Sequence, residues 1–179
     1  MRIIAGSLKG RTLEAPTWDG LRPTSDKLRE TLFNVLSSRV PDSNVLDVFA
    51  GSGALCLEAL SRGAARVVFV EHDRRAAALI GSNVTRCGVN ERCVIIRDAA
   101  ERVLQNPIDG DPFDLVMLDP PYALEPVADV VHAAAKHLAP EGLLILEHAT
   151  RRVPPALDGM QLVRTVRSGD SSLTMFEVR

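Results

Sequence analysis

The sequence changes from apolar to glycine-rich along Val45-Leu46-Asp47-Val48-Phe49-Ala50-Gly51-Ser52-Gly53. Residues 45–49 predict a buried β-strand, and the glycines predict a tight turn into a helix over residues 54–61. Glycine permits positive φ and lets a ligand approach the main chain closely. Open α/β sheets bind nucleoside ligands at this place, the carboxyl end of the first strand. The stretch therefore predicts an α/β fold with a nucleoside-type cofactor site.

Further apolar runs repeat the strand pattern downstream. They alternate with Ala- and Leu-rich stretches long enough for helices, which is the spacing of βαβ units. Near-continuous hydrophobicity is typical of strands buried on both faces of a parallel sheet. We expect these strands at residues 67–70, 94–96, 115–118 and 143–146, with Gly63, Gly88 and Gly142 where helices or turns end. Together these runs predict a doubly wound, Rossmann-like and mostly parallel sheet.

Both ends of the chain depart from that alternation. Residues 2–5 and 11–14 predict a small β-hairpin, followed by a helix that Thr24 or Ser25 can cap. Residues 162–166 and 173–178 flank a turn and predict a closing antiparallel hairpin. We therefore expect an N-terminal hairpin-and-helix extension over residues 1–40 and a cofactor-binding domain over residues 41–179.

Charge is divided unevenly along the 179 residues. Residues 1–40 hold seven basic and four acidic side chains and therefore carry a net charge of +3. Because the whole chain has a net charge of −2, residues 41–179 carry −5. A basic arm on an acidic body suits contact between the arm and phosphate groups. No apolar run approaches the roughly 18 residues of a membrane span, and cysteines and histidines are scattered without metal-ligand spacing. We expect a cytoplasmic monomer with no membrane and no metal partner.

Acidic residues follow the first three predicted strands. Asp47 can face the positively charged end of S-adenosylmethionine or hold the amides of its own loop. Glu71 can accept hydrogen bonds from ribose hydroxyls, as acids do in nicotinamide sites too. Asp98 can accept a proton of the adenine amino group or cap the helix near Ala99. S-adenosylmethionine is favoured over a dinucleotide because Cys56 occupies the third position of the G-x-G-x-x-G pattern.

The tetrapeptide Asp119-Pro120-Pro121-Tyr122 follows the fourth predicted strand. Two prolines fix two φ angles and leave carbonyl groups free to accept hydrogen bonds. An exocyclic amine of a base is a poor nucleophile, and its lone pair must point at the methyl donor. Asp119 and the Pro120 carbonyl could hold the two N–H protons while Tyr122 stacks on the base, so positioning and electrostatics suffice for transfer.

The chain resembles known methyltransferases in these motifs. Residues 47–53 and 119–122 resemble motifs I and IV of class I amino-methyltransferases that act on DNA and RNA. Gly6-Ser7-Leu8-Lys9-Gly10-Arg11 and Arg22-Pro23-Thr24-Ser25-Asp26-Lys27-Leu28-Arg29-Glu30-Thr31-Leu32-Phe33-Asn34 resemble a narrower family, the RsmD-type methyltransferases. That family modifies guanine N2 in bacterial small-subunit (16S) rRNA, typically guanine 966.

The resemblance implies a role for each matched residue. S-adenosylmethionine would be bound by Asp47, Phe49, Ala50, Gly51, Ser52, Gly53, Glu71, His72, Asp98 and Ala99. The guanine would be held by Asp119, Pro120, Pro121 and Tyr122, and RNA would be met by Lys9, Arg11, Arg22 and Thr24. The resemblance implies that the substrate is an assembled or partly assembled small subunit. We also expect no segment large enough for a separate target-recognition domain, so specificity would come from the shape of the particle and the small N-terminal arm.

Three alternatives remain open on the sequence. A DNA adenine- or cytosine-amino methyltransferase would use the same tetrapeptide but lacks a recognition domain here. A nicotinamide-dependent oxidoreductase could use the same crevice, although Cys56 and the lack of an obvious hydride-transfer acid disfavour it. A non-enzymatic RNA-binding scaffold would have no need of Asp119–Tyr122.

Overall fold

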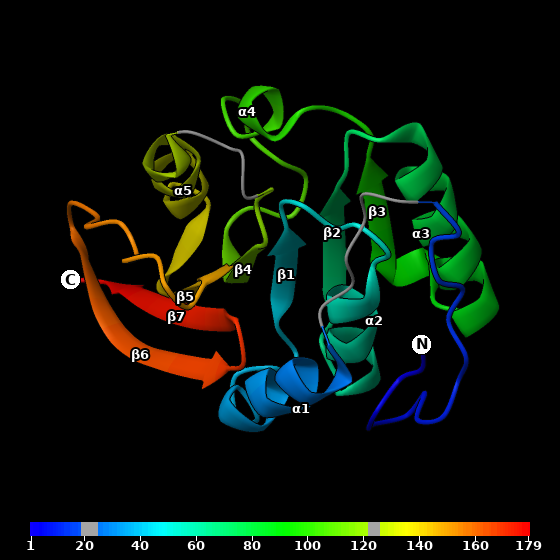
Figure 1. Cartoon of the computed structure of the whole chain (residues 1–179). Helices are drawn as coiled ribbons and strands as arrows, with labels where there is room; N and C mark the ends of the chain where they lie inside the picture. Colours follow the sequence, from blue (N-terminus) through cyan, green and yellow to red (C-terminus); the bar gives the residue numbers. More distant parts are fainter. Residues whose placement is uncertain (19–24, 122–125) are drawn as a thin grey trace.

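The computed structural model describes residues 1–18, 25–121 and 126–179, which form one sheet with helices on both faces (Figure 1). The strands are β1 (Asn44–Asp47), β2 (Arg66–Val70), β3 (Cys93–Ile96), β4 (Phe113–Leu118), β5 (Leu138–Ala149), β6 (Met160–Ser168) and β7 (Ser171–Val178). The helices are α1 (Asp26–Val35), α2 (Ala54–Ser61), α3 (Arg74–Cys87), α4 (Ala100–Val103) and α5 (Val127–Ala135), with a 3₁₀ turn at Asn90–Arg92. Among these helices, none is long and apolar enough to cross a membrane.

The seven strands lie in the order β3-β2-β1-β4-β5-β7-β6. β1 pairs in parallel with β2 and β4, and the outer pairs β2–β3 and β4–β5 are parallel as well. β7 is antiparallel to both β5 and β6. The predicted fold class, a mostly parallel doubly wound sheet with an antiparallel C-terminal hairpin, is confirmed. The chain winds outward in both directions from β1, so a crevice is expected where the carboxyl ends of β1 and β4 meet.

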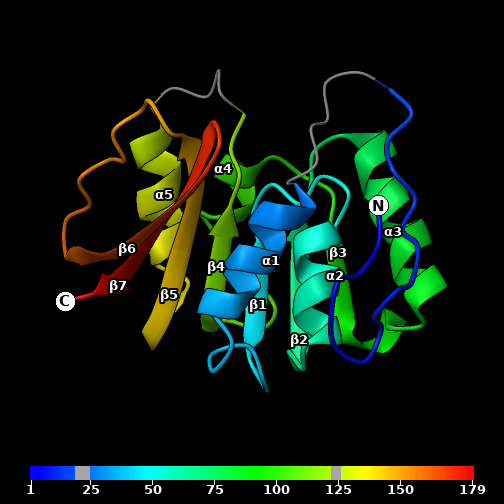
Figure 2. The same ribbon diagram turned by 60° about the horizontal axis from the view of Figure 1, so that its bottom comes forward.

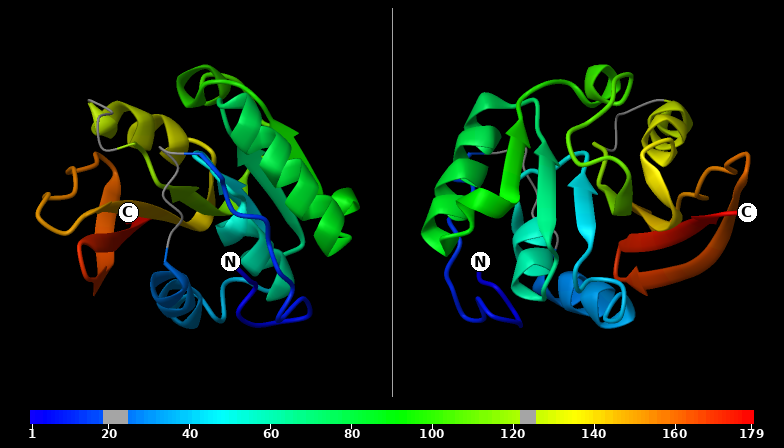
Figure 3. Two further views of the ribbon diagram at one scale, coloured as in Figure 1. Left: turned by 45° about the vertical axis from the view of Figure 1, so that its right-hand side comes forward. Right: turned by 180° about the vertical axis from the view of Figure 1, so that it is seen from behind.

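Two apolar cores lie on opposite faces of the sheet. Val45 of β1 packs in the core beneath α1, α2 and α3, whereas its neighbour Leu46 packs in the core beneath α4 and α5. Successive side chains of a strand point to opposite faces, so this alternation fixes which face every later strand residue occupies. Figure 2 shows the face that α1 and α2 cover, and Figure 3 shows the sheet from two other sides.

The N-terminal extension packs on the same core as the sheet. Ile3 and Leu13 of the hairpin are buried, as are Leu28 and Leu32 of α1. Ser25 caps α1, because its hydroxyl accepts a hydrogen bond from the Leu28 amide at 3.2 Å. The other predicted cap, Thr24, lies outside the described residues.

The predicted N-terminal hairpin forms, but it is short. Its strands pair antiparallel at a single bridge, Arg2 with Thr12. The ladder stops there because the next amides, of Ile4 and Ala5, donate to the carboxylate of Glu58 at 2.8 and 3.0 Å instead of to another strand. The hairpin is therefore anchored to α2 and is not a free arm.

Glu58 is the centre of a buried polar cluster. It is 0% exposed, and it also accepts a hydrogen bond from Arg62 Nε at 2.8 Å. The fully buried Arg29 of α1 has its Nε 3.8 Å from Glu58 and donates through Nη2 to the Arg2 carbonyl at 2.7 Å. Three segments that are distant in sequence thus share one carboxylate.

Two details of the predicted sheet were wrong. β1 ends at Asp47, so Val48 and Phe49 belong to the turn that follows it. Gly142 lies inside β5, not at the end of a helix or turn, because β5 begins earlier than expected, at Leu138. The β4–β5 register shifts between Phe113 and Leu115, and a Cβ on Gly142 would lie 2.9 Å from the Phe113 carbonyl oxygen. The glycine permits this close approach. Gly63 and Gly88, in contrast, follow α2 and α3 as predicted.

Candidate active site

A cavity of about 750 Å³ lies at the carboxyl ends of the central strands. Its size falls within the range of small-molecule sites. It is lined by Trp18, Ser25, Leu28, Asp47, Phe49, Ala50, Gly51, Ser52, Ala54, Leu55, Glu71, His72, Asp73, Arg75, Asp119, Pro120, Pro121, Glu147 and Ser168–Ser171. Most of the described residues predicted after the first, second and fourth strands therefore meet in one place, although Gly53 is not among the lining residues.

Four carboxyl groups line this cavity from four adjacent strands. Glu71 follows β2, Asp47 ends β1, Asp119 follows β4 and Glu147 lies in β5. Each is two residues beyond a side chain of the core beneath α1–α3, namely Phe69, Val45, Met117 and Ile145. Because side chains alternate with a period of two, all four acids are on the same face of the sheet. The topology thus gathers four acidic groups over one cavity.

Asp47 is the most deeply buried of these acids, at 1% exposure. Its Oδ1 accepts no hydrogen bond from the part of the chain that the structure describes. Burial raises the pKa of Asp47 to about 7, and the charge of Glu71 adds to this, whereas a hydrogen bond from the Phe49 amide opposes it. A buried carboxylate oxygen that faces a cavity suits a ligand that carries positive charge.

Asp47 should lower the stability of the ligand-free protein at neutral and alkaline pH. Its folded pKa lies above its ordinary value, so the folded state binds more protons than the unfolded state between about pH 4 and 7. The contribution of Asp47 to the free energy of unfolding therefore falls as the pH rises from about 4 to 7. We expect Asp47→Asn to raise the free energy of unfolding by about 1–3 kcal/mol at pH 8, and by less at pH 5.

Urea unfolding at the two pH values, without ligand, measures this difference. The exposed Asp129→Asn, on α5, is the matched control and should leave stability unchanged at both pH values. Equal stability of Asp47→Asn and the parent protein at pH 8 would contradict the account.

The glycine turn between β1 and α2 is held by Glu71. The Gly51 amide donates to Glu71 Oε2 at 2.9 Å, and the Asp73 amide donates to Oε1 at 2.8 Å. Gly53, the N-cap of α2, has a φ of 76°, and a Cβ there would lie 3.2 Å from the Phe69 ring. Glycine is therefore required by both backbone conformation and space. Each Glu71 oxygen keeps a further lone pair that can accept a ligand hydroxyl.

The tetrapeptide after β4 places Asp119 beside the glycine turn. Asp119 and Pro120 are mostly buried, Pro121 is exposed, and all three line the cavity. Burial raises the pKa of Asp119 well above its ordinary value, and the charges of Glu147 and Asp47 raise it further. Donors of hydrogen bonds or positive charge are needed to stabilise its ionised form. Tyr122, predicted to stack on the base, lies outside the described residues.

Asp98 and Ala99 are not among the residues that line the cavity. Asp98 Oδ1 accepts hydrogen bonds from the Ala99 amide at 2.7 Å and from Arg102 Nε at 2.8 Å, and the pairing with Arg102 lowers its pKa. The N-cap of α4 is Ala99, so the prediction that Asp98 caps this helix is wrong. The helix begins one residue later than expected, and Asp98 bonds to its neighbour instead.

The predicted RNA-binding residues Lys9 and Arg11 lie far from the cavity. The Ser7 amide donates to the carbonyl of Ser61, the last residue of α2, while Ala54 at the start of α2 lines the cavity. Arg11 donates to the Arg86 carbonyl, in the last turn of α3, at 2.9 Å. At about 1.5 Å per residue, these helix ends lie roughly 10–20 Å beyond the cavity. The other two predicted contacts, Arg22 and Thr24, lie outside the described residues.

Several residues of the cavity wall were not predicted from the sequence, among them Glu147, the turn Ser168–Ser171 and Trp18. Glu147 directly follows the predicted fifth strand, and its position after a buried run was the signal that could have identified it. The turn Ser168–Ser171, between β6 and β7, reaches the cavity from the C-terminal hairpin. Trp18 stacks against the guanidinium of Arg75, 5.0 Å from the ring centroid, at the start of α3. No local pattern indicates either of these last two contacts.

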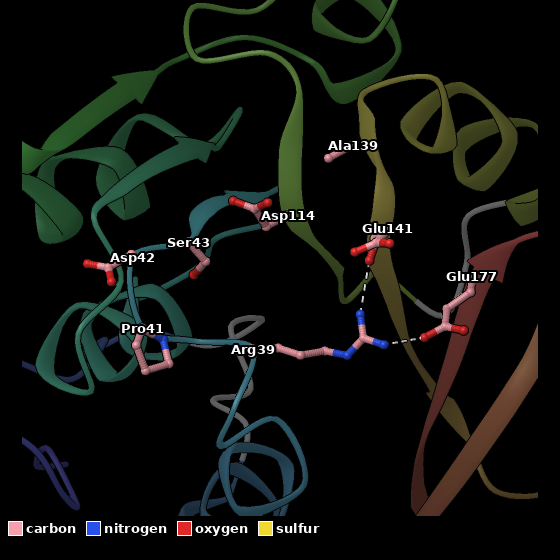
Figure 4. A pocket seen from close by; sticks show the side chains of 8 residues that line it. All are labelled: Arg39, Pro41, Asp42, Ser43, Asp114, Ala139, Glu141 and Glu177. Carbon is pink, nitrogen blue, oxygen red and sulfur yellow. Dashed lines mark hydrogen bonds and ion pairs between the residues drawn. The ribbon is translucent and has the colours of Figure 1, made fainter.

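A second pocket, of about 650 Å³, lies at the opposite ends of β1 and β4 (Figure 4). Arg39 extends across it and donates to the Glu141 carbonyl at 2.9 Å and to Glu177 at 2.5 Å. Asp114 accepts a hydrogen bond from the Asn44 amide.

Over the described ranges, no group of three or more His, Cys, Asp or Glu side chains could hold a metal ion.

The strand order, the glycine turn after β1 and Asp119-Pro120-Pro121 after β4 define a class I methyltransferase-like α/β fold. An O-methyltransferase from Bacillus cereus, solved in complex with SAH, has this fold, with a TM-score of 0.71 at 16% identity over 88% of this chain and 83% of that chain. The yhhF protein of Escherichia coli is more similar: its structure has a TM-score of 0.89 at 31% identity and covers 99% of this chain and 97% of its own.

The particular family follows from the sequence comparisons. Residues 1–177 match the family described as Conserved hypothetical protein 95. Ribosomal RNA small subunit methyltransferase D of Escherichia coli K12 is 38% identical over 149 residues, which are 82% of this chain and 74% of that protein. The chain belongs to this RsmD-type methyltransferase family, and the resemblance seen in its N-terminal motifs is confirmed.

Proposed function

We propose that this protein transfers a methyl group from S-adenosylmethionine to the exocyclic N2 amine of a guanine in small-subunit (16S) rRNA. The observation that carries the proposal is the shared cavity, in which Asp119 and Pro120 lie next to the glycine turn and the buried Asp47. We further propose that the enzyme acts as a monomer in the cytoplasm, on an assembled or partly assembled small subunit, at the family's position, guanine 966.

The β1–β2 side of the cavity fits the proposed cofactor. Gly51 lines the cavity without a side chain, Gly53 permits the positive-φ turn, and Glu71 has lone pairs for ribose hydroxyls. Asp47 offers a buried negative charge to the positively charged methionine end. When bound, the cofactor supplies an already activated methyl group, so these side chains need only bind and orient it.

Asp119 and the Pro120 carbonyl would act on the amine. By accepting its two N–H protons, they orient the nitrogen lone pair toward the methyl group. The C–S bond breaks as the C–N bond forms, the sulfur keeps the electron pair, and the nitrogen then loses one proton. Asp119, with its raised pKa, is suited to receive that proton.

The target nucleotide must leave its stack to reach such a cavity. The names of the relatives support an RNA target in the small subunit, since several are called ribosomal RNA small subunit methyltransferase D. Basic groups stand at the rim, where Arg75 lines the cavity and Arg74 is exposed beside it. These groups can contact phosphates around the extruded base.

Transfer of tritiated methyl groups tests the macromolecular substrate. Small subunits from cells that lack the enzyme, purified large subunits and duplex DNA are offered in parallel, each with labelled S-adenosylmethionine. We expect label in small-subunit rRNA alone. Label only in duplex DNA would show that the enzyme is a DNA amino-methyltransferase. Absence of label from all three substrates would refute methyl transfer to nucleic acid.

We expect Lys9→Ala combined with Arg11→Ala to raise the KM for small subunits about 3–10-fold, through lost phosphate contacts. Because these residues lie at the far ends of α2 and α3, kcat and cofactor affinity should stay unchanged. Lys136→Ala, an exposed charge at the end of α5, is the control. An unchanged KM over a range of salt concentrations would remove the hairpin from the RNA interface.

A further inference from the structure

Of the four acids that the adjacent strands place over the cavity, Glu147 is the one without a role in the proposed mechanism. It is 7% exposed, although its side chain is a carboxyl group at the end of a buried strand segment, Leu143–Leu146. Acidic side chains are rarely buried unless they bind something or are paired. Glu147 interacts within the protein, and the several lone pairs of a carboxylate let it accept a hydrogen bond from a ligand in the cavity as well.

The sheet register places Glu147 beside Asp119. β4 and β5 pair Met117 with Ile145 and Leu118 with Leu146, so the next residues along the two strands are Asp119 and Glu147. Paired strands lie about 4.8 Å apart, and both side chains are on the face of Met117 and Ile145. The effect of Glu147 on the pKa of Asp119 agrees with this short separation. The two carboxyl groups can therefore contact one ligand together.

The four acids form two pairs along the strand order β2-β1-β4-β5. Glu71 and Asp47 belong to β2 and β1, next to the glycine turn, which is the cofactor side of such sheets. Asp119 and Glu147 belong to β4 and β5, on the side that the Ser168–Ser171 turn closes. Glu147 thus lies on the side left for the methyl acceptor.

Guanine presents two donors next to each other, the N2 amine and the N1–H group. Adenine and 2-aminopurine instead present a lone pair at N1, which a carboxylate repels. We propose that Glu147 accepts the N1–H of the target guanine while Asp119 accepts an N2–H, so that Glu147 selects guanine over bases with a lone pair at N1. This inference rests on the proposed function and assigns base selection within the same cavity.

2-Aminopurine separates recognition of N1 from the chemistry at N2, because it keeps the N2 amine but lacks the N1–H. Small subunits are reassembled with rRNA that carries either guanine or 2-aminopurine at the target nucleotide. We expect the parent enzyme to prefer guanine by about 100-fold in kcat/KM, as a charged hydrogen bond at N1 would give. In Glu147→Gln, whose amide can donate to the N1 lone pair, the preference should fall below about 10-fold.

Two further variants distinguish a loss of base recognition from a general disturbance of the structure. Glu147→Asp keeps the charge but withdraws it by one methylene, so it should keep the preference for guanine at a lower kcat/KM. Glu141→Gln, an exposed position of the same strand, should change neither quantity. Cofactor affinity of every variant should match that of the parent, because Glu147 lies on the acceptor side.

The outcomes are distinct. A guanine preference that is unchanged in Glu147→Gln, with cofactor affinity intact, would overturn the assignment of Glu147 and leave the proposed function standing. If Glu147→Gln fails to fold, loss of the guanine preference in Glu147→Asp would overturn it as well. Failure of the parent enzyme to label guanine-containing subunits would instead refute the proposed function.

Discussion

Asp119→Ala is expected to lower methyl transfer to small subunits by about 10³-fold or more, while cofactor affinity changes less than about threefold. The carboxylate is needed to orient the amine and to accept its proton, and both effects arise only as the methyl group moves. Cofactor affinity should persist because the glycine turn, Glu71 and Asp47, which would bind the cofactor, stay in place. Single-turnover transfer and equilibrium binding of the cofactor measure the two quantities separately.

Asp129→Ala, an exposed aspartate of α5, serves as the control for Asp119→Ala and should transfer at the parent rate. Asp119→Asn keeps the shape but loses the charge, and we expect it to be nearly as slow as the alanine variant. Parent-like turnover in Asp119→Ala would show that the tetrapeptide does not hold the reacting amine.

Glu58→Ala is expected to lower the free energy of unfolding by about 3–5 kcal/mol, which is the usual consequence of removing one partner of a buried ionic cluster. The amides of Ile4 and Ala5 would lose their acceptor, and the buried Arg29 would lose the buried carboxylate that lies 3.8 Å from its Nε. For a chain of this length, the loss corresponds to a fall in Tm of roughly 10 °C.

Glu101→Ala, an exposed glutamate of α4, is the control for Glu58→Ala and should leave Tm within about 1–2 °C of the parent value. Native-state hydrogen exchange adds a local test, since the amides of Ile4 and Ala5 should lose protection before the sheet does. A parent-like Tm together with protected amides would show that Glu58 does not anchor the hairpin to α2.

The sheet could be predicted because buried parallel strands leave a strong local pattern. Residues 67–70 were predicted as a strand and lie within β2, and the helix over residues 54–61 has the predicted bounds. Gly142 was misassigned because the local sequence does not distinguish a glycine that ends a turn from a glycine inside a strand. In β5 the glycine is needed because a Cβ would come too close to the carbonyl oxygen of Phe113. The anchoring of the hairpin by Glu58 depends on contacts across more than 50 residues, which no local pattern records.

The site was predictable where its residues directly follow strands. Asp47, Glu71 and Asp119 meet in one cavity because parallel strands bring their carboxyl ends to one edge of the sheet. Asp98 also follows a strand, yet it pairs with Arg102 away from the cavity. The placement of Lys9 and Arg11 could not be predicted. The motif shows which residues the chain shares with the family, but it does not show where the hairpin packs on the sheet and helices.

The identity of the methylated nucleoside tests the central claim most directly. Small subunits labelled by the enzyme are digested to nucleosides, and the product is separated and weighed by mass spectrometry. The account predicts a single labelled species, N2-methylguanosine, which disappears with Asp119→Ala. Label in N6-methyladenosine or N4-methylcytidine would contradict it, because the cavity would then hold a different amine beside Asp119.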